Sequence, residues 1–215
     1  LDLRVLESIS LPDFKEPDLT AWRSFMTKFS NPRTKVKIGL VGKYNELQDA
    51  YKSIHESFVH AGTTNYCKVV VDAIHSEDIL NQTDAERKLK HLDAVLVAPG
   101  FGERGIDGKL EAIRFVRENK IPFFGICLGM QCAVVEFARN VAGIENAAST
   151  EIEENAEDPV IFLMKEQRDI TQKGGTMRLG KYECQLKEGS RAHSIYQNTA
   201  IYERHRHRYE FNNDY

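Results

Sequence analysis

Between residues 35 and 139, short apolar runs that end near glycine or proline alternate with helix patterns. Each run is continuously apolar rather than alternating, as expected for strands of a sheet with both faces covered. This rhythm favours an α/β fold with an open, mostly parallel sheet flanked by helices. The predicted strands are 36–42, 68–74, 94–98 and 123–126, and the predicted helices are 48–61, 83–92, 110–119 and 130–139.

The two ends of the chain depart from this rhythm. Residues 1–34 contain Pro12, Pro17 and Pro32 and an amphipathic stretch at 19–29. We interpret them as an interdomain linker or arm, and the alternative is a helix packed on the same domain. Residues 35–215 are then one domain. After about residue 150 the rhythm fades, and apolar segments predict antiparallel additions in the C-terminal third, at 160–163, 182–186 and 200–202.

Composition narrows the class of protein. Hydrophobic residues make up 41% of the chain and charged residues 28%, which is ordinary for a soluble globular protein. The net charge of −3 argues against nucleic acid as a partner. No apolar run reaches the roughly 20 residues of a membrane helix. Four cysteines without a C-x-x-C pair indicate reduced thiols and a cytoplasmic location.

The segment Gly125-Ile126-Cys127-Leu128-Gly129 has the form G-x-C-x-G between a predicted strand and a predicted helix. A residue on such a sharp turn has a strained backbone, and glycines two residues away on either side relieve the crowding. The Cys127 thiol would project at a helix N-terminus, where the dipole favours the thiolate. The backbone N–H of Leu128 is placed to donate to an oxyanion. Cys127 is therefore the candidate nucleophile.

A second oxyanion donor should come from another strand end, because sites in such sheets lie at the carboxyl ends of the strands. Pro99-Gly100-Phe101-Gly102 follows the strand at 94–98, and glycine lets a backbone approach a ligand closely.

Longer motifs make the chain resemble a known family. The segment 125–131, GICLGMQ, resembles the nucleophile segment of class I glutamine amidotransferases. Three further segments resemble the CTP synthase family within that class: VGKY with DAYKS at 41–53, GGTMRLG at 174–180 and ERHRHRYE at 203–210. The likeness covers essentially all of 35–215, and the arm at 1–34 resembles that family's linker from a synthetase domain.

The resemblance implies hydrolysis of L-glutamine to glutamate and ammonia through a thioester on Cys127, with metal playing no part in this domain. It implies that glutamine contacts Gly100 and the nucleophile loop at Leu128, Gly129, Met130 and Gln131. It implies that Glu151 binds the substrate α-amino group and Arg208 its carboxylate. A zwitterionic amino acid needs one anion and one cation, and arginine can bind a carboxylate with two hydrogen bonds.

The resemblance also implies partners outside this domain. Ammonia would pass to a synthetase domain of the same polypeptide, where ATP and Mg²⁺ support the conversion of UTP to CTP, a nucleotide-binding step of pyrimidine biosynthesis. The full-length protein would be a homotetramer. GTP would act as an allosteric activator, and its candidate pocket comprises Lys43, Tyr44, Phe101 and Arg104.

The sequence departs from the family pattern in two places. The family's general base lies in a His-Pro-Glu segment after the nucleophile, and this sequence shows none before Tyr215, so we expect the chain as printed to lack full glutaminase activity. His75-Ser76-Glu77 is a coincidental H-x-E, and His205 and His207 match a different family segment. Ala98-Pro99-Gly100 has one glycine where many members have two.

Other interpretations stay open. The chain could be the amidotransferase part of another enzyme, such as GMP synthase, although the segments at 174–180 and 203–210 argue against it. A cysteine peptidase on a related sheet would leave Glu151 and Arg208 unexplained. A non-catalytic glutamine- or GTP-binding module is the third alternative. The chain has no P-loop pattern, so it is not expected to make CTP by itself.

Overall fold

The computed structural model describes residues 2–10, 17–47, 49–164, 167 and 175–215. Its internal contacts divide the chain into two compact units. One unit comprises residues 1–36 and 52–70, and the other comprises residues 37–51 and 71–215. The boundary between an arm at 1–34 and a domain at 35–215 remains a prediction.

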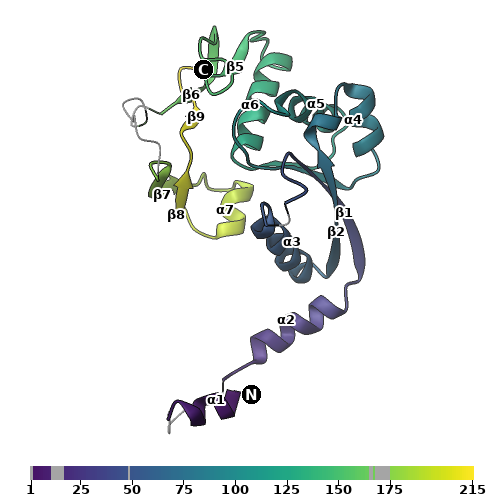
Figure 1. The fold of residues 1–215 in the computed structure, drawn as a ribbon, viewed down its shortest axis with the longest axis vertical. Coiled ribbons are helices and arrows are strands. Elements are labelled where there is room, and N and C mark those ends of the chain that lie inside the picture. Colours follow the sequence, from purple (N-terminus) through teal and green to yellow (C-terminus); the bar gives the residue numbers. More distant parts are fainter. Residues whose placement is uncertain (1, 11–16, 48, 165–166, 168–174) are drawn as a thin grey trace. The chain divides into compact units, whose positions relative to one another are not determined.

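The main sheet has four strands in the order β2–β1–β3–β4 (Figure 1). Its strands are β1 (Thr34–Gly42), β2 (Cys67–His75), β3 (Ala94–Val97) and β4 (Phe123–Gly125). The pairs β1–β3 and β3–β4 are parallel, as predicted. Val41 lies opposite Val97, which lies opposite Gly125, so these three strands end at one edge. The loops that follow them are therefore brought together.

Helices pack on this sheet in the second unit. They are α4 (Gln82–Leu89), α5 (Ile106–Glu118) and α6 (Leu128–Asn140), preceded by the 3₁₀ turn η1 (Ser76–Asp78). α5 and α6 lie side by side, and both contact β3 and β4. Arg117 on α5 donates two hydrogen bonds from Nε and one from a terminal nitrogen to the Glu136 carboxylate on α6, at 2.8–3.0 Å. Because Glu136 is 2% exposed, this bidentate pair fixes α5 against α6.

The C-terminal third contributes two smaller sheets and one helix: β5 (Ala147–Ser149), β6 (Asp158–Leu163), β7 (Arg178–Gln185), α7 (Arg191–Tyr196), β8 (Ala200–Arg206) and β9 (Tyr209–Phe211). The pairs β6–β9 and β7–β8 are antiparallel, as predicted. β5–β6 is parallel, because a loop at 150–157 returns the chain in the same direction. Gly174, the first residue of the GGTMRLG segment, lies outside the described residues.

The first unit contains α1 (Asp2–Ser8), α2 (Thr20–Ser30) and α3 (Lys52–Thr64). The rings of Trp22, Phe25 and Phe29 form a row along α2, and Phe25 lies 5.4 Å from the His60 ring on α3. The predicted amphipathic helix at 19–29 is confirmed, and it packs on α3. In place of the predicted 48–61, α3 begins at Lys52, and Gln48 lies outside the described residues.

Two predicted helices begin earlier than their apolar pattern indicated. α5 begins at Ile106 rather than 110, because Gly105 adopts φ +73° as its N-cap and Ile106 is buried. α6 begins at Leu128 rather than 130, immediately after Cys127. Both earlier starts bring a helix N-terminus closer to the carboxyl edge of the sheet.

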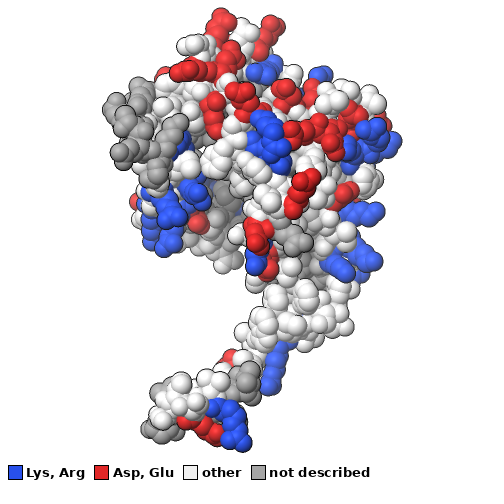
Figure 2. Space-filling view, in the orientation of Figure 1, with Lys and Arg blue, Asp and Glu red and all other residues white. Residues whose placement is uncertain are grey.

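Charged side chains of both signs are interspersed over much of the face in Figure 2. Lys and Arg gather over β7 and β8, the pair of strands that carries Arg178, Lys181, Arg204 and Arg206. In the part of the chain that the structure describes, no helix has the length and apolar character needed to cross a membrane.

Candidate active site

Cys127 occupies the sharp turn between β4 and α6. Its backbone has φ +52° and ψ −111°, a conformation that costs a non-glycine residue about 1–3 kcal/mol. A Cβ at Gly125 would lie 2.7 Å from the Gly129 backbone, and a Cβ at Gly129 would lie 2.1 Å from the Val97 carbonyl oxygen. The predicted strained turn with glycine on each side is confirmed, and the glycines are required by backbone contacts.

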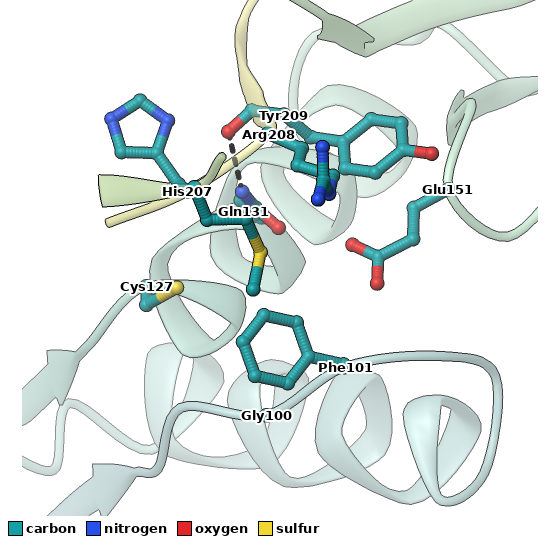
Figure 3. A pocket seen from close by; sticks show the side chains of 9 residues that line it. Gly100, Phe101, Cys127, Gln131, Glu151, His207, Arg208 and Tyr209 are labelled. Atoms are coloured by element: carbon teal, nitrogen blue, oxygen red, sulfur yellow. Dashed lines mark hydrogen bonds between the residues drawn. The ribbon is translucent and has the colours of Figure 1, made fainter. Parts of the chain in front are cut away.

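A cavity of about 400 Å³ opens beside Cys127 (Figure 3). Its lining comes from the ends of β3, β4 and β5, from α6, from the residue before β7 and from the segment around β9: Gly100, Phe101, Cys127, Gln131, Glu151, Met177, His207, Arg208 and Tyr209. Gln131 is 5% exposed and donates from Nε2 to the Tyr209 carbonyl oxygen at 2.9 Å, which ties α6 to β9. The cavity therefore joins segments more than 100 residues apart.

Two opposite charges face this cavity. In Figure 3 the Glu151 carboxylate and the Arg208 guanidinium lie on one side and Cys127 lies on the other. Glu151 Oε1 accepts a hydrogen bond of 2.9 Å from the Gly102 N–H. Arg208 donates to Gln167 Oε1 at 2.6 Å and to Thr176 Oγ1 at 2.9 Å. Both charges are thus held by neighbours, as binding of a zwitterionic ligand requires.

The loop after β3 is held by the ammonium of Lys43. Lys43 is 4% exposed, and its Nζ donates to the carbonyl oxygens of Phe101, Gly102 and Arg104. Arg104 returns a hydrogen bond to the Lys43 carbonyl at 3.2 Å and pairs with Glu77 at 2.7 Å. The guanidinium of Arg104 also lies 5.8 Å from the centre of the Tyr44 ring.

The four residues considered for an effector pocket therefore cluster around one loop. Phe101 is 48% exposed and presents its ring, while the Lys43 ammonium is directed into the protein.

Burial raises the pKa of the Cys127 thiol above its ordinary value. The Glu151 carboxylate acts in the same direction, while the Leu128 N–H and the Lys109 ammonium act against it. The expected direction of the helix N-terminus holds for the Leu128 N–H, which favours the thiolate, but desolvation disfavours the thiolate more strongly and the pKa of the thiol is raised.

The structure brings together most of the residues expected to bind glutamine. Gly100, Gln131, Glu151 and Arg208 share the cavity with Cys127. Leu128 and Gly129 are buried; the Leu128 N–H acts on the Cys127 thiol, whereas the Gly129 N–H donates to the Ile126 carbonyl oxygen at 2.9 Å. Met130 is 42% exposed and lines a neighbouring cavity with Cys127.

Sequence reasoning did not assign Met177, His207 and Tyr209 to the site. Met177 lies in GGTMRLG and the other two lie in ERHRHRYE, so membership of these motifs was the available signal. In Figure 3 the His207 imidazole extends away from Cys127. Its Nε2 lies 3.1 Å from Nδ1 of His205, and burial and His205 together lower its pKa.

Among the described residues, no group of three or more His, Cys, Asp or Glu side chains could hold a metal ion.

The comparisons with known proteins identify the family of the chain and a similar fold. The family model "Glutamine amidotransferase class-I" matches residues 46–215. A protein of Cytophaga hutchinsonii named CTP synthase is 57% identical over 215 residues, which are 100% of this chain and 40% of that protein. A CTP synthase of Chlorobium phaeobacteroides is 52% identical over 217 residues, covering 100% of this chain and 38% of that protein. The chain thus spans about two fifths of the length of these relatives.

A solved structure has a similar fold. It is described as "Trypanosoma brucei CTPS - glutaminase domain with bound acivicin". The TM-score is 0.73 with 38% sequence identity, over 82% of this chain and 68% of the other.

Proposed function

We propose that Cys127 is the nucleophile in the hydrolysis of the side-chain amide of glutamine. The premise is that this chain belongs to the class-I glutamine amidotransferase family. One observation carries the proposal. A single cavity presents a nucleophile at a strained turn, a carboxylate and a guanidinium. A free amino acid with an α-amino and an α-carboxylate group matches the two fixed charges, and its side-chain amide then extends toward the thiol.

The proposed chemistry follows from these positions. The Cys127 sulfur attacks the amide carbon, and the oxyanion accepts hydrogen bonds from backbone N–H groups at Leu128 and near Gly100. The C–N bond breaks, the nitrogen takes up the thiol proton and leaves as ammonia, and a thioester remains. Water then attacks the thioester, so that glutamate is released and the thiol is restored.

Covalent labelling tests this function without requiring turnover. A glutamine-mimicking electrophile should modify Cys127, and peptide mapping should locate the adduct. Free L-glutamine should slow the labelling, whereas asparagine, one methylene shorter, should not. Cys184→Ser is the matched control, because Cys184 is exposed and lies outside the cavity. Binding of glutamine without any labelling of Cys127 would favour a non-catalytic binding module.

We extend the proposal to the longer protein of which this chain matches about two fifths. The chain would supply ammonia to a synthetase domain that uses ATP and Mg²⁺ to convert UTP to CTP, within a homotetramer. The support is the name of the relatives, which are 52–57% identical to this chain. A cytoplasmic setting belongs to the same proposal, supported by four unpaired cysteines.

The longer polypeptide offers a direct test. Cys127→Ala should abolish CTP formation from glutamine and leave CTP formation from added ammonium salts unchanged. Loss of both would mean that Cys127 serves the synthetase step or the fold instead.

GTP is proposed as an effector near Phe101, Tyr44 and Arg104, which cluster at the loop after β3. Phe101→Ala should weaken activation by GTP about fivefold, since one exposed ring contributes about 1 kcal/mol of stacking. Because Phe101 also lines the cavity beside Cys127, the activation is expressed relative to the rate of the same variant without GTP. An unchanged GTP response would remove Phe101 from the effector site.

A further inference from the structure

Lys109 is a buried lysine that the proposed reaction does not yet use. It lies in the first turn of α5 and is 0% exposed. Its Nζ donates a hydrogen bond of 2.7 Å to the Ala98 carbonyl oxygen, at the carboxyl end of β3. No salt bridge to a described carboxylate accompanies this bond. Burying an ammonium with a single hydrogen bond costs desolvation free energy, so a purely structural role does not account for this lysine.

The position of Lys109 is fixed by its helix. The adjacent Gly108 sits so close to η1 that a Cβ there would lie 1.7 Å from the Ser76 carbonyl oxygen. At the other end of α5, Arg117 is paired with the buried Glu136 of α6. α5 therefore has little freedom to move Lys109 toward solvent.

The ammonium lies close to Gly100, in the segment 99–102 that is the candidate second oxyanion donor. Nζ is 3.8 Å from where a Cβ would stand on Gly100, whose backbone lines the cavity. Besides burial, which acts most strongly on Lys109, the groups that act on it are the Cys132 thiol on α6, the Lys43 ammonium after β1 and the Cys127 thiol in the turn before α6. Among the described side chains, the Lys109 ammonium acts to favour the Cys127 thiolate, opposite to the Glu151 carboxylate.

We infer that Lys109 is a positioning residue for the nucleophile, and this inference rests on the proposed glutaminase function. Its ammonium holds the end of β3 through the Ala98 carbonyl. From there it supplies the positive charge that favours the Cys127 thiolate and the oxyanion beside Gly100. The electrostatic interactions of such a desolvated charge are stronger than in water, because a low effective dielectric surrounds it. Burial lowers the pKa of Lys109 to about 8, so the charge is present at neutral pH.

The test separates charge, hydrogen bond and packing. Lys109→Met removes the charge with similar length, Lys109→Gln keeps a donor without charge, and Lys109→Arg keeps the charge. Lys90→Met is the matched control, because the Lys90 side chain is 63% exposed. The rate of Cys127 alkylation by iodoacetamide is measured from pH 6 to 10, with peptide mapping to distinguish Cys127 from the other thiols. Thermal unfolding is measured on the same proteins.

Lys109→Met and Lys109→Gln should both slow alkylation at pH 7 about threefold, the effect of roughly half a unit in the thiol pKa, because Lys109 makes a smaller contribution to that pKa than burial, Leu128 or Glu151. Below about pH 8, where Lys109 is charged, their rates should lie under that of the parent protein, and above it the profiles should converge because the lysine is then neutral. Lys109→Arg, which stays charged, should retain the rate at pH 7. The midpoint of unfolding should stay equal or rise, because a buried charge is removed. A lowered midpoint with an unchanged alkylation profile would overturn the inference and leave a structural lysine.

Two further outcomes separate the charge of Lys109 from its hydrogen bond, and its role from the proposed glutaminase function. If Lys109→Gln alkylates like the parent protein, the hydrogen bond rather than the charge matters, and the electrostatic role is wrong. Iodoacetamide carries no amino-acid group, so its rate reports on the thiolate whether or not glutamine is the substrate. A slowed alkylation in a protein that never reacts with glutamine mimics would therefore support the role of Lys109 and contradict only the proposed function.

Discussion

The nucleophile turn at 125–131 and the cation site at Arg208 serve one cavity but are built in opposite ways. The turn is local: Cys127, its two flanking glycines and the helix that follows are contiguous in sequence. The cation site is assembled from a distance, because Arg208 is held by Gln167 and Thr176, which lie 41 and 32 residues away. The nucleophile turn can therefore be predicted from sequence, whereas the Arg208 site forms only when distant segments come together on folding.

The two regions should also differ in how they respond to substitution. The turn resists change because a Cβ at either glycine would collide with backbone atoms, which cannot rotate away. The cation site depends on side-chain hydrogen bonds, each of which contributes only about 1 kcal/mol. Substitutions should therefore affect the two regions by different amounts and through different observables.

The largest effect is expected at the turn. Gly129→Ala places a methyl group 2.1 Å from the Val97 carbonyl oxygen, so α6 must move away from β3. We expect a loss of about 3 kcal/mol in the free energy of unfolding, measured by urea denaturation, together with loss of Cys127 labelling. Gly143→Ala is the control: its φ is +75°, but nothing lies within 4 Å of the added Cβ. Gly143→Ala therefore measures backbone strain alone, and Gly129 has no positive φ. A loss for Gly129→Ala no larger than that for Gly143→Ala would show that the contact with β3 does not hold the turn.

The next effect separates binding from reactivity. Arg208→Lys keeps the charge but loses the forked geometry. The KM for glutamine, measured by ammonia release from the longer polypeptide, should rise about 30-fold, equivalent to ~2 kcal/mol for a hydrogen bond to a charged group. Alkylation of Cys127 by iodoacetamide should stay unchanged. A parallel loss of alkylation would show that the two regions are coupled, which would break the contrast.

A smaller effect is expected when only the support of Arg208 is altered. Thr176→Val removes the hydroxyl that accepts from Arg208 at 2.9 Å while preserving shape. The KM for glutamine should rise about fivefold, as for one hydrogen bond of ~1 kcal/mol. Thr64→Val, which removes an exposed hydroxyl bonded to the His60 carbonyl, is the control. An unaltered KM would mean that Gln167 and the remaining contacts position Arg208 without Thr176.

The mildest perturbation is a change of pH. Burial raises the pKa of the Cys127 thiol, so its thiolate fraction at pH 7 is lower than that of a free thiol. Its alkylation rate should therefore keep rising above the pH at which N-acetylcysteine reaches its plateau. Glu151→Gln should move the Cys127 profile toward lower pH, because the carboxylate contributes to the raised pKa. A profile that reaches its plateau below that of N-acetylcysteine would contradict the dominance of burial.

The sequence by itself determined the alternating α/β architecture, the parallel direction of the pairs β1–β3 and β3–β4, and the place of Cys127 in a strand-to-helix turn. These features follow from apolar runs and glycine spacing, which act over a few residues. Element boundaries were less accurate: α5 and α6 begin earlier than their apolar pattern, because Gly105 and Cys127 set their N-termini through backbone conformation. The short strand β5 and the helix α7 have no pattern long enough to detect.

Only the tertiary structure decided which distant residues share the cavity and in what electrical environment. Glu151 lies in an acidic run and Arg208 in a basic one, and no local rule distinguishes them from surface charges. The direction of the Cys127 pKa also depended on folding, because desolvation is a property of the packed surroundings and outweighed the local helix terminus. The burial of Lys109 also depends on tertiary packing. Nothing in the sequence distinguishes this lysine, and its ammonium is buried at the end of β3 because α5 packs against η1 and α6.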